Sequence, residues 1–459
     1  MNFLKKSPAD RRKMILEGNI LSTLFILSLP TIIMALVQSM IPVFDGFFLN
    51  NYGGVLVAGA VTFSAPVINI LNGLSMGLGS AGMAIIGQFN GLGDVKRVKH
   101  MSLQLLFFGL ILGIISAPLL YFLAKILTNY VNPEVAPYIF QYLSLYSFVM
   151  PMLFMAAIYN GIKNAMGQPE ATLIRMIMLM VLKLIFSFIF LKVFSLGAKG
   201  AVFSSFCSYT IITLWLYYDL FIKQQDYRLS FKNFRPDWAS IREYIRIGLP
   251  SMLASMFVYL GFFLINMEVQ SYGPKVLAAQ GIASNINALT FTVPSSISTT
   301  VTTMMAMNVG SNNIPKAKDV YKKSLIMGAI LSISMIVIIT PLSRSFVEIF
   351  QRTIKDEEII SIATHALKIY NFSVFGFTLY MVVQGALLAL GRTKITLAAG
   401  LLRVWGFRYI FILLTKHILG VNAVFWGNLF SNTICAALYI ILFYKIPFKS
   451  DIIDLDHLS

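Results

Sequence analysis

The chain has 459 residues, of which 57% are hydrophobic and only 12% are charged, and its mean hydropathy is +0.77. An ordinary soluble domain is about 25% charged, so this composition excludes a large soluble protein and indicates a polytopic membrane protein. The net charge of +17 is dispersed over many short loops. That dispersal fits the cytoplasmic bias of Lys and Arg in membrane proteins, and we expect the lipid bilayer, not nucleic acid, as partner.

Long apolar runs predict where the chain crosses the membrane. A run of at least about 18 apolar residues is long enough to span a bilayer. The sequence has twelve, at residues 21–49, 54–88, 101–123, 138–160, 173–193, 200–223, 246–270, 277–308, 325–346, 364–390, 396–418 and 423–446. We therefore predict an all-α polytopic membrane protein with twelve transmembrane helices. No small-residue cleavage site follows the charged N-terminal stretch, so the first segment should remain as a helix.

Loop charges predict the orientation. Loop 50–54 has no cation and loop 194–199 only Lys199, whereas the alternate loops and the N-terminal stretch are rich in Lys and Arg. Cationic loops face the cytoplasm. We expect a multi-pass protein of the cell (inner, cytoplasmic) membrane with both termini cytoplasmic.

The second half of the chain repeats the first. Matching features lie 219 to 224 residues apart, at Leu29-Pro30 and Leu249-Pro250, Tyr52-Gly53 and Tyr272-Gly273, Gly91 and Gly310, Gly167 and Gly391, and Gly197 and Gly420. Six segments per repeat is an even number, so the two repeats are parallel, with substrate expected at their interface. We predict two six-helix lobes related by pseudo-two-fold symmetry. The predicted units are a cytoplasmic N-terminal segment 1–20, an N-lobe 21–223, a cytoplasmic linker 224–245, a C-lobe 246–446 and a cytoplasmic tail 447–459.

Asp45 is the one carboxylate well inside an apolar segment. A charge inside a bilayer costs of order a few kcal/mol, so one that is kept usually faces a cavity or a partner. Ion coupling needs a carboxylate that is charged in one state and neutralised in another, which makes Asp45 the first candidate. The alternative is a carboxylate that only satisfies polar groups between helices. Pro42, three residues earlier, removes a backbone hydrogen bond and is a candidate hinge.

Several short motifs occur in a characteristic order. They are Glu17-Gly18-Asn19-Ile20 followed by Leu29-Pro30, Gln38 and Asp45; Gly87-Gln88 with Gly91 and Asp94; Asn160 with Gly167-Gln168-Pro169; and Leu196-Gly197 with Gly200-Ala201. Over essentially the whole chain this order resembles the multidrug and toxic compound extrusion (MATE) family. The resemblance implies a secondary active antiporter that exports an amphipathic, often cationic compound in exchange for Na⁺ or H⁺. It also implies Asp45 as the coupling carboxylate. We expect no cofactor and a monomer.

Two features depart from the family pattern. The DinF-like branch usually carries an Asn and, four residues later, an Asp in its fifth helix, where this chain has Lys183 and Ser187. The NorM-like branch uses acids in helices seven and ten, but here Glu268 comes too late in helix seven and the Gln384 region of helix ten has no acid. The resemblance is therefore closer to the DinF-like branch, with an altered ion site.

Lys183 and Ser187 are four residues apart and share one helix face. A buried ammonium needs a partner, and Asp45 is the candidate. An Asp45–Lys183 pair would put a cation where Na⁺ binds in relatives, which argues for H⁺ as the coupling ion. The other interpretation is a lysine that lines a wet cavity or repels cationic cargo.

Polar residues at membrane depth supply candidates for the substrate cavity. Hydrogen bonding between helices explains most such residues. We select Gln38, Asn72, Asn160, Gln384 and Arg403. For Arg403 two interpretations stand: it meets an anionic substrate or lipid headgroup, or it satisfies carbonyl groups or lies near the cytoplasmic end of its helix.

Two alternative functions are weighed. A lipid-linked oligosaccharide or lipid flippase of related architecture would show several cations facing the cavity, and Lys183, Arg403 and Arg408 keep this alternative open. A receptor or membrane-embedded enzyme would need a large ectodomain or a catalytic cluster, and the sequence shows neither. The sequence therefore favours a transporter over an enzyme.

Overall fold

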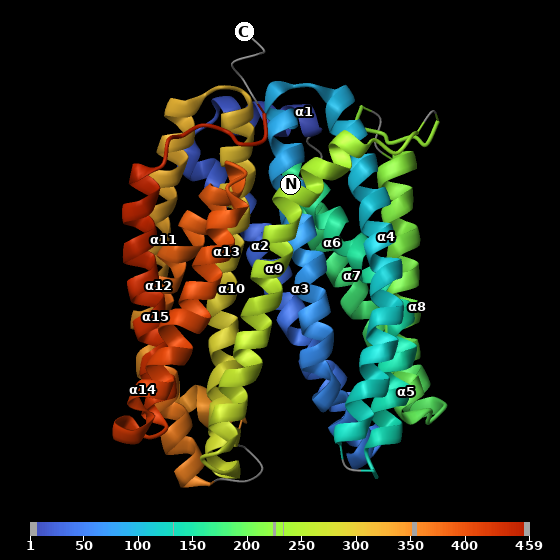
Figure 1. The fold of residues 1–459 in the computed structure, drawn as a ribbon, viewed down its shortest axis with the longest axis vertical. Coiled ribbons are helices and arrows are strands. Elements are labelled where there is room, and N and C mark those ends of the chain that lie inside the picture. The colour runs from blue at the N-terminus through green and yellow to red at the C-terminus, as the bar shows by residue number, and fades with distance from the viewer. Residues whose placement is uncertain (1–6, 132, 224–225, 233, 351–355, 454–459) are drawn as a thin grey trace.

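The computed structural model of the protein describes residues 7–131, 133–223, 226–232, 234–350 and 356–453. Parts of the predicted N-terminal segment, linker and C-terminal tail lie outside these residues. Within them, twelve helical segments are long and apolar enough to cross a membrane. The predicted fold class is thus confirmed, and the two groups of helices in Figure 1 are consistent with two lobes.

The first half of the chain forms a short helix and six spans. The helices are α1 (Pro8–Glu17), α2 (Ile20–Phe48), α3 (Val55–Leu92), α4 (Val95–Leu127), α5 (Ala136–Tyr146), α6 (Met150–Ala165), α7 (Pro169–Ser187) and α8 (Gly197–Tyr218). Helices α5 and α6 together make one span, joined by the 3₁₀ turn Ser147–Val149. Wider π-helical turns continue α2, α7 and α8 at Leu49–Gly53, Phe188–Val193 and Asp219–Lys223.

The second half forms six further spans. They are built from α9 (Trp238–Gln270), α10 (Pro274–Gly310), α11 (Ile314–Phe350), α12 (Glu357–Ala389), α13 (Thr393–Leu401), α14 (Ile410–Leu419) and α15 (Asn422–Lys445). Helices α13 and α14 form one span through the π-helical segment Leu402–Tyr409.

Helix α9 begins eight residues before the predicted start of the C-lobe at residue 246. Asp237 caps it by accepting hydrogen bonds from the backbone N–H groups of Ala239 and Ser240, at 3.0 and 3.3 Å. Such a cap satisfies amide groups that have no partner inside the helix. The hydrogen bond from the Ser240 hydroxyl is the main cause that lowers the pKa of Asp237 to about 2. The apolar pattern locates the span, whereas the cap determines where the helix starts.

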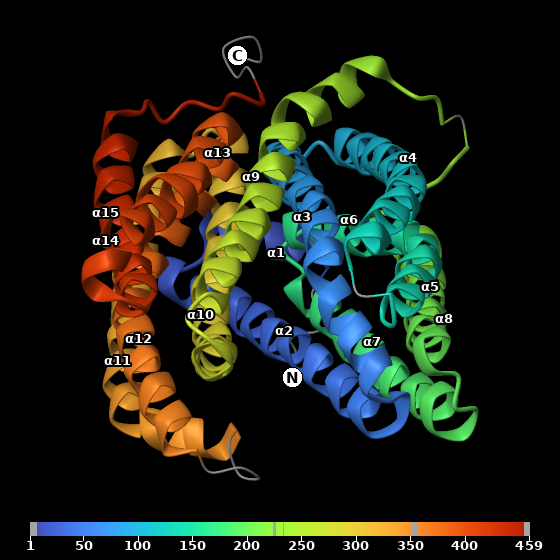
Figure 2. The ribbon, with the colours of Figure 1, turned by 60° about the horizontal axis from the view of Figure 1, so that its bottom comes forward.

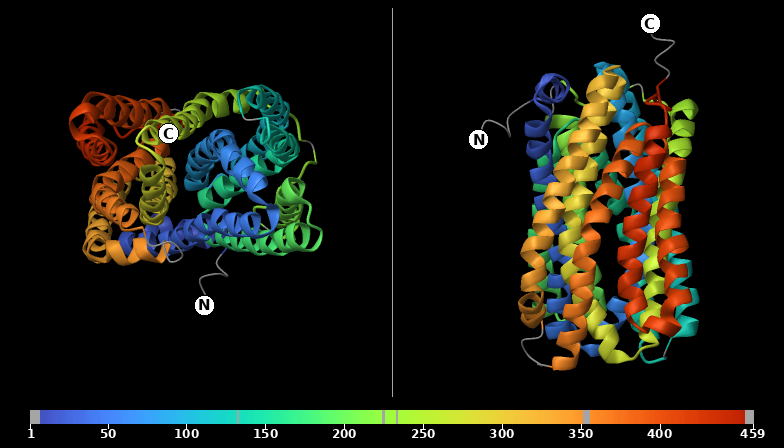
Figure 3. Two further views of the ribbon diagram at one scale, coloured as in Figure 1. Left: turned by 90° about the horizontal axis from the view of Figure 1, so that it is seen from below. Right: turned by 90° about the vertical axis from the view of Figure 1, so that its left-hand side faces the viewer.

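The two groups of helices converge at one end of the molecule and separate toward the other (Figure 1). The described ends of the chain, α1 and the residues after α15, lie at the convergent end, which we call the terminal end. Seen from the opposite end, the two groups lie side by side (Figure 3).

Helices α2 and α9 run between the groups (Figure 2). Near the terminal end each packs on the opposite lobe: Leu24 and Leu27 of α2 are buried with α10 and α11, and Ile247 and Met252 of α9 are buried with N-lobe helices. The first helix of each lobe is therefore shared. Movement of one lobe against the other must bend or displace these two helices.

Helices α3 and α10 cross at a pair of glycines near the terminal end. A Cβ atom on Gly91 would lie 2.1 Å from the Met307 carbonyl oxygen, and one on Gly310 would lie 2.0 Å from that of Gln88. Both distances are far below van der Waals contact, so only glycine allows the backbones to approach this closely. These two glycines are one of the repeat-related pairs found in the sequence.

Both ends of the chain also join the lobes. Arg11 of α1 forms an ion pair with Glu170 of α7 at 2.9 Å, while Lys316 of α11 donates to the carbonyl of Leu16 at 2.7 Å. After α15, the Ser450 hydroxyl donates to Gln88 of α3 at 2.6 Å. The terminal end is thus closed by a helix crossing and by both chain ends.

Candidate transport site

Asp45 lies in the last turn of α2, far from the terminal end, and forms an ion pair with Lys183 of α7. Their side chains are 32% and 12% exposed, with Lys183 the more enclosed. Helix α2 continues without interruption through Pro42. The ion pair therefore joins the shared helix α2 to a helix that belongs wholly to the N-lobe.

Ser187 lies one turn beyond Lys183 but does not complete the ion pair directly. Its hydroxyl is 2.8 Å from that of Ser204 in α8, and Ser204 also donates to the Lys183 carbonyl at 3.2 Å. Asp45, Lys183 and Ser187 do line one small cavity of about 20 Å³. That volume holds about one water molecule, so the space around the ion pair has no room for a hydrated metal cation.

A larger cavity of about 360 Å³ lies farther toward the middle of the molecule. Three of the predicted cavity residues, Gln38, Asn72 and Asn160, line it, and so does the hinge candidate Pro42. Tyr259 of α9 and Thr299 of α10 also contribute, so the C-lobe forms part of the wall. The volume lies in the range of small-molecule pockets, and a position between the lobes is where parallel-repeat transporters bind substrate.

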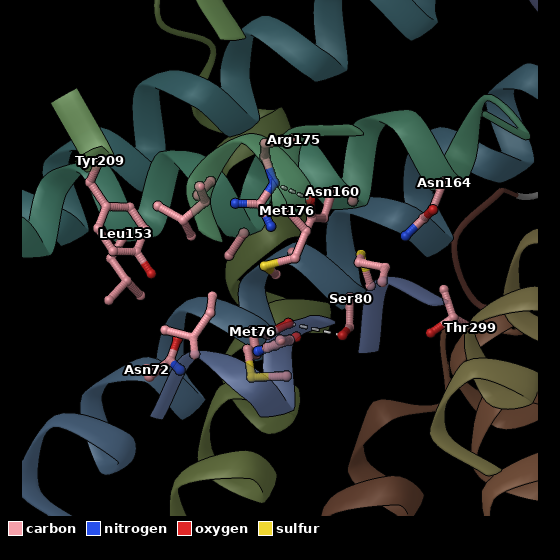
Figure 4. Close-up of a pocket in the computed structure, with 18 of the residues that line it drawn as sticks. Asn72, Met76, Ser80, Leu153, Asn160, Asn164, Arg175, Met176, Tyr209 and Thr299 are labelled. Atoms are coloured by element: carbon pink, nitrogen blue, oxygen red, sulfur yellow. Dashed lines mark hydrogen bonds between the residues drawn. The ribbon is translucent and has the colours of Figure 1, made fainter. Parts of the chain in front are cut away.

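Arg175 is the residue that the sequence analysis missed. It projects from α7 into the cavity (Figure 4), and its Nε donates to Asn160 Oδ1 at 3.0 Å. It is the one charged side chain among the residues that line this cavity. Arg175 lies eight residues, or two steps of four, before Lys183, so it shares the helix face of Lys183 and Ser187. Extending that face toward the start of α7 would have identified Arg175 from the sequence.

The other two predicted cavity residues lie elsewhere. Gln384, in α12, and Arg403 are not among the residues that line the cavity. Arg403 donates to Asn432 Oδ1 at 3.1 Å inside the C-lobe, and its guanidinium lies 5.0 Å from the centre of the Tyr380 ring. In this structure neither residue therefore lines the cavity, and Arg403 instead satisfies an amide oxygen within its own lobe and stacks on an aromatic ring.

A second buried ion pair stabilises the N-lobe. Lys163 of α6 is 2.5 Å from Asp219, and both side chains are almost fully buried. The Tyr159 hydroxyl donates to the same carboxylate at 2.8 Å. Because Asp219 already has two buried partners, it is a structural group, whereas the Asp45 side chain is 32% exposed.

The family model named MatE matches residues 30–189 and 250–414, which is one segment in each lobe. Among curated relatives, the chain is 22% identical over 440 residues to the multidrug export protein MepA of Staphylococcus haemolyticus, covering 94% of both chains. It is 24% identical over 438 residues to the probable multidrug resistance protein YpnP of Bacillus subtilis, covering 94% of this chain and 96% of the relative.

Solved structures share the fold. A MATE protein in complex with MaL6 superimposes with a TM-score of 0.89 at 19% identity, covering 94% of this chain and 97% of the other. A transporter of the MOP superfamily from Pyrococcus furiosus, described as having reversed polarity in its binding pocket, gives a TM-score of 0.88 at 20% identity with the same coverage. With the family model matching most of the chain, the protein belongs to the MatE family of membrane transporters and is not an enzyme.

Proposed function

We propose that this protein is a secondary active antiporter that exports small amphipathic compounds across the cell membrane by alternating access, with H⁺ as the coupling ion. MepA is named a multidrug export protein and YpnP a probable multidrug resistance protein, which supports export of drugs and does not favour the flippase alternative. The observation that carries the coupling proposal is the Asp45–Lys183 ion pair.

The ion pair offers one place for a proton to act. Protonation of Asp45 removes the negative charge and leaves the Lys183 ammonium, only 12% exposed, without its counter-ion. Separating a buried pair in this way costs of order a few kcal/mol. Even about 1–3 kcal/mol changes a conformational equilibrium by roughly 5- to 150-fold, which is enough to favour another arrangement of α2.

Helix α2 can respond to that change. Pro42 cannot donate to the carbonyl of Gln38, so the helix is weakened between the cavity and the ion pair. Gln38 and Pro42 both line the cavity. A bend at Pro42 would therefore reshape the cavity while the terminal half of α2 stays packed against the C-lobe. In this proposal Asp45, Lys183 and Ser187 form the ion-coupling site, with Pro42 as hinge.

The choice of H⁺ over Na⁺ rests on the position of Lys183. The ammonium already pairs with Asp45, so the carboxylate has its positive partner, and the adjoining cavity of about 20 Å³ offers no room for a second cation with its hydration shell. This is the DinF-like arrangement, a carboxylate in the N-lobe, with a lysine in place of a bound metal ion.

The test is dye efflux from proteoliposomes under an imposed pH or Na⁺ gradient. We expect the pH gradient to drive efflux by the wild type, and Asp45→Asn and Lys183→Asn to lose that response. Glu348→Gln, which changes an exposed carboxylate at 47% exposure, is the matched control and should behave as wild type. Equal gradient-driven efflux by wild type and Asp45→Asn would refute the proposal, and efflux driven by Na⁺ alone would refute the choice of ion.

A further inference from the structure

Arg175 is a buried cation without a carboxylate partner. The residue is 3% exposed, and no ion pair involves it within the described part of the chain. Its hydrogen bond to Asn160 uses Nε alone. The terminal nitrogens of the guanidinium remain free to meet a ligand, and Figure 4 shows them pointing from α7 toward the Asn72 and Met76 side of the cavity.

The rest of the cavity wall carries no opposite charge. It combines amides and hydroxyls, such as Asn69, Asn72 and Thr299, with flexible apolar side chains, such as Met76 and Met176. Methionines adapt to ligands of varied shape, and the polar groups can orient one end of a ligand. The ligand-binding space is thus apolar and adaptable, with one fixed positive charge.

A charge in that position is costly unless an anion offsets it. Arginine stays protonated in proteins, and an unpaired charge that is only 3% exposed loses several kcal/mol of solvation. Ionisable groups at membrane depth therefore usually serve the substrate pathway. The guanidinium presents parallel N–H donors that match a carboxylate, sulfonate or phosphate.

We propose that the cavity selects amphipathic anions, whose acidic group binds the terminal nitrogens of Arg175 while the apolar body packs against Met76 and Met176. This inference rests on the proposed export function and names its substrate class. It replaces the cationic cargo that the family resemblance implies, because a cation in this cavity would meet Arg175 and no lining carboxylate.

Two buried arginines in the C-lobe also favour an anionic ligand. Arg403 and Arg408 are buried, at 5% and 6% exposure, and neither forms an ion pair with a carboxylate of the described residues. Together with Arg175 they leave the interior with an excess of positive charge. Arg403 and Arg408 do not line the cavity, so they act on a ligand there only through their long-range field, whereas Arg175 can contact it directly.

Two dyes with the same ring system test the inference directly. Fluorescein carries a carboxylate, and tetramethylrhodamine methyl ester is a cation. Binding to the purified full-length protein in detergent is followed by fluorescence anisotropy, with no gradient present. We expect the wild type to bind fluorescein at least about tenfold more tightly than the cationic dye, since hydrogen bonds to a charged group are worth about that factor or more.

Substitutions assign the selectivity to Arg175. Arg175→Gln should weaken fluorescein binding roughly ten- to hundredfold and leave binding of the cationic dye unchanged or improved. Arg175→Lys keeps the positive charge but loses the planar pair of N–H donors, so its affinity for fluorescein should lie between those of the wild type and Arg175→Gln. Arg242→Gln removes an exposed cation outside the cavity and should have no effect. Displacement of fluorescein by dihexanoylphosphatidylglycerol would identify a lipid phosphate as the anion, and lack of displacement a soluble amphiphile.

The outcomes separate this inference from the proposed function. A wild type that does not prefer fluorescein overturns the inference even if every Arg175 variant fails to fold, and so does an Arg175→Gln protein that retains both the fold and the preference. Arg175-dependent binding without gradient-driven efflux would instead uphold the anion site and reject the antiport proposal.

Discussion

The Gly91–Gly310 crossing gives the sharpest test of how the terminal end stays closed. An alanine at Gly91 would place its Cβ 2.1 Å from the Met307 carbonyl oxygen, and ordinary contact begins near 3.4 Å. Backbone atoms of two packed helices cannot rotate away as a side chain can, so α3 and α10 must separate by about 1.3 Å at this point. The same argument applies to Gly310→Ala against Gln88, where the distance is 2.0 Å.

The expected magnitude follows from the cost of overpacking, typically about 1–3 kcal/mol. If that cost falls on the closed arrangement alone, each substitution shifts the equilibrium away from it by roughly 5- to 150-fold. Gly59→Ala in α3 and Gly281→Ala in α10 are matched controls, because a Cβ at either position has no neighbour within 4 Å. Each control lies in the same helix as one of the two tested glycines, so the four variants compare a tight and an open position in each helix.

The assay is a distance measurement by double electron–electron resonance. Spin labels replace the exposed residues Lys96 and Lys322, which lie near the terminal end in α4 and α11, after Cys207 and Cys435 are removed. We expect Gly91→Ala and Gly310→Ala to add a population with a longer distance, and the two controls to match the wild type. If all four variants give the wild-type distribution, the glycine crossing does not hold the terminal end closed.

Two further predictions concern stability. Asp219→Asn should lower the free energy of unfolding by about 3–5 kcal/mol because it leaves Lys163 buried and unpaired. The double variant Asp219→Asn, Lys163→Met should recover much of this loss. If thermal unfolding shows that the losses of the two single variants simply add in the double variant, the two residues are not coupled. Asp237→Ala should lower the free energy of unfolding by about 0.5–2 kcal/mol because it removes the cap of α9. Asp237→Asn should keep most of the capping stabilisation, since an amide oxygen can accept the same backbone hydrogen bonds. Hydrogen bonds from the Ser240 hydroxyl and from backbone N–H groups hold the pKa of Asp237 at about 2. The stabilisation by the carboxylate is therefore fully present above the unfolded pKa near 3.9 and is lost as the pH falls through 2. We expect the difference in melting temperature between wild type and Asp237→Ala to shrink from pH 6 to pH 2, and a constant difference would contradict this.

The spans and the repeat could be predicted from the sequence because both are local properties. A bilayer requires about 20 apolar residues for each crossing, whatever the neighbouring helices do. Asp45 could be identified for the same reason, since a charged residue within an apolar run can be recognised from the linear sequence without the fold. The Lys183–Ser187 stripe needed only the helical period. Helix ends were less accessible: a single cap, Asp237, moved the start of α9 by eight residues.

Which candidates share a cavity was decided only by the tertiary structure. Gln38, Asn72 and Asn160 meet around one space, while Gln384 and Arg403 lie outside it. Membership depends on how α2, α3, α6 and α7 rotate against one another, and no pattern within a single helix encodes that rotation. Asp45 and Lys183 are 138 positions apart, yet the packing of α2 on α7 brings them into contact.

The sequence by itself determined that this protein has twelve membrane helices, two repeats and one conspicuous intramembrane carboxylate. The tertiary structure decided that α2 and α9 are shared between the lobes, that repeat-related glycines form a backbone crossing, and that Arg175 is the charge in the cavity. The physical reason is the range of each interaction. Transfer into lipid acts residue by residue along the chain, whereas close packing and burial of a charge depend on neighbours that only the folded chain supplies.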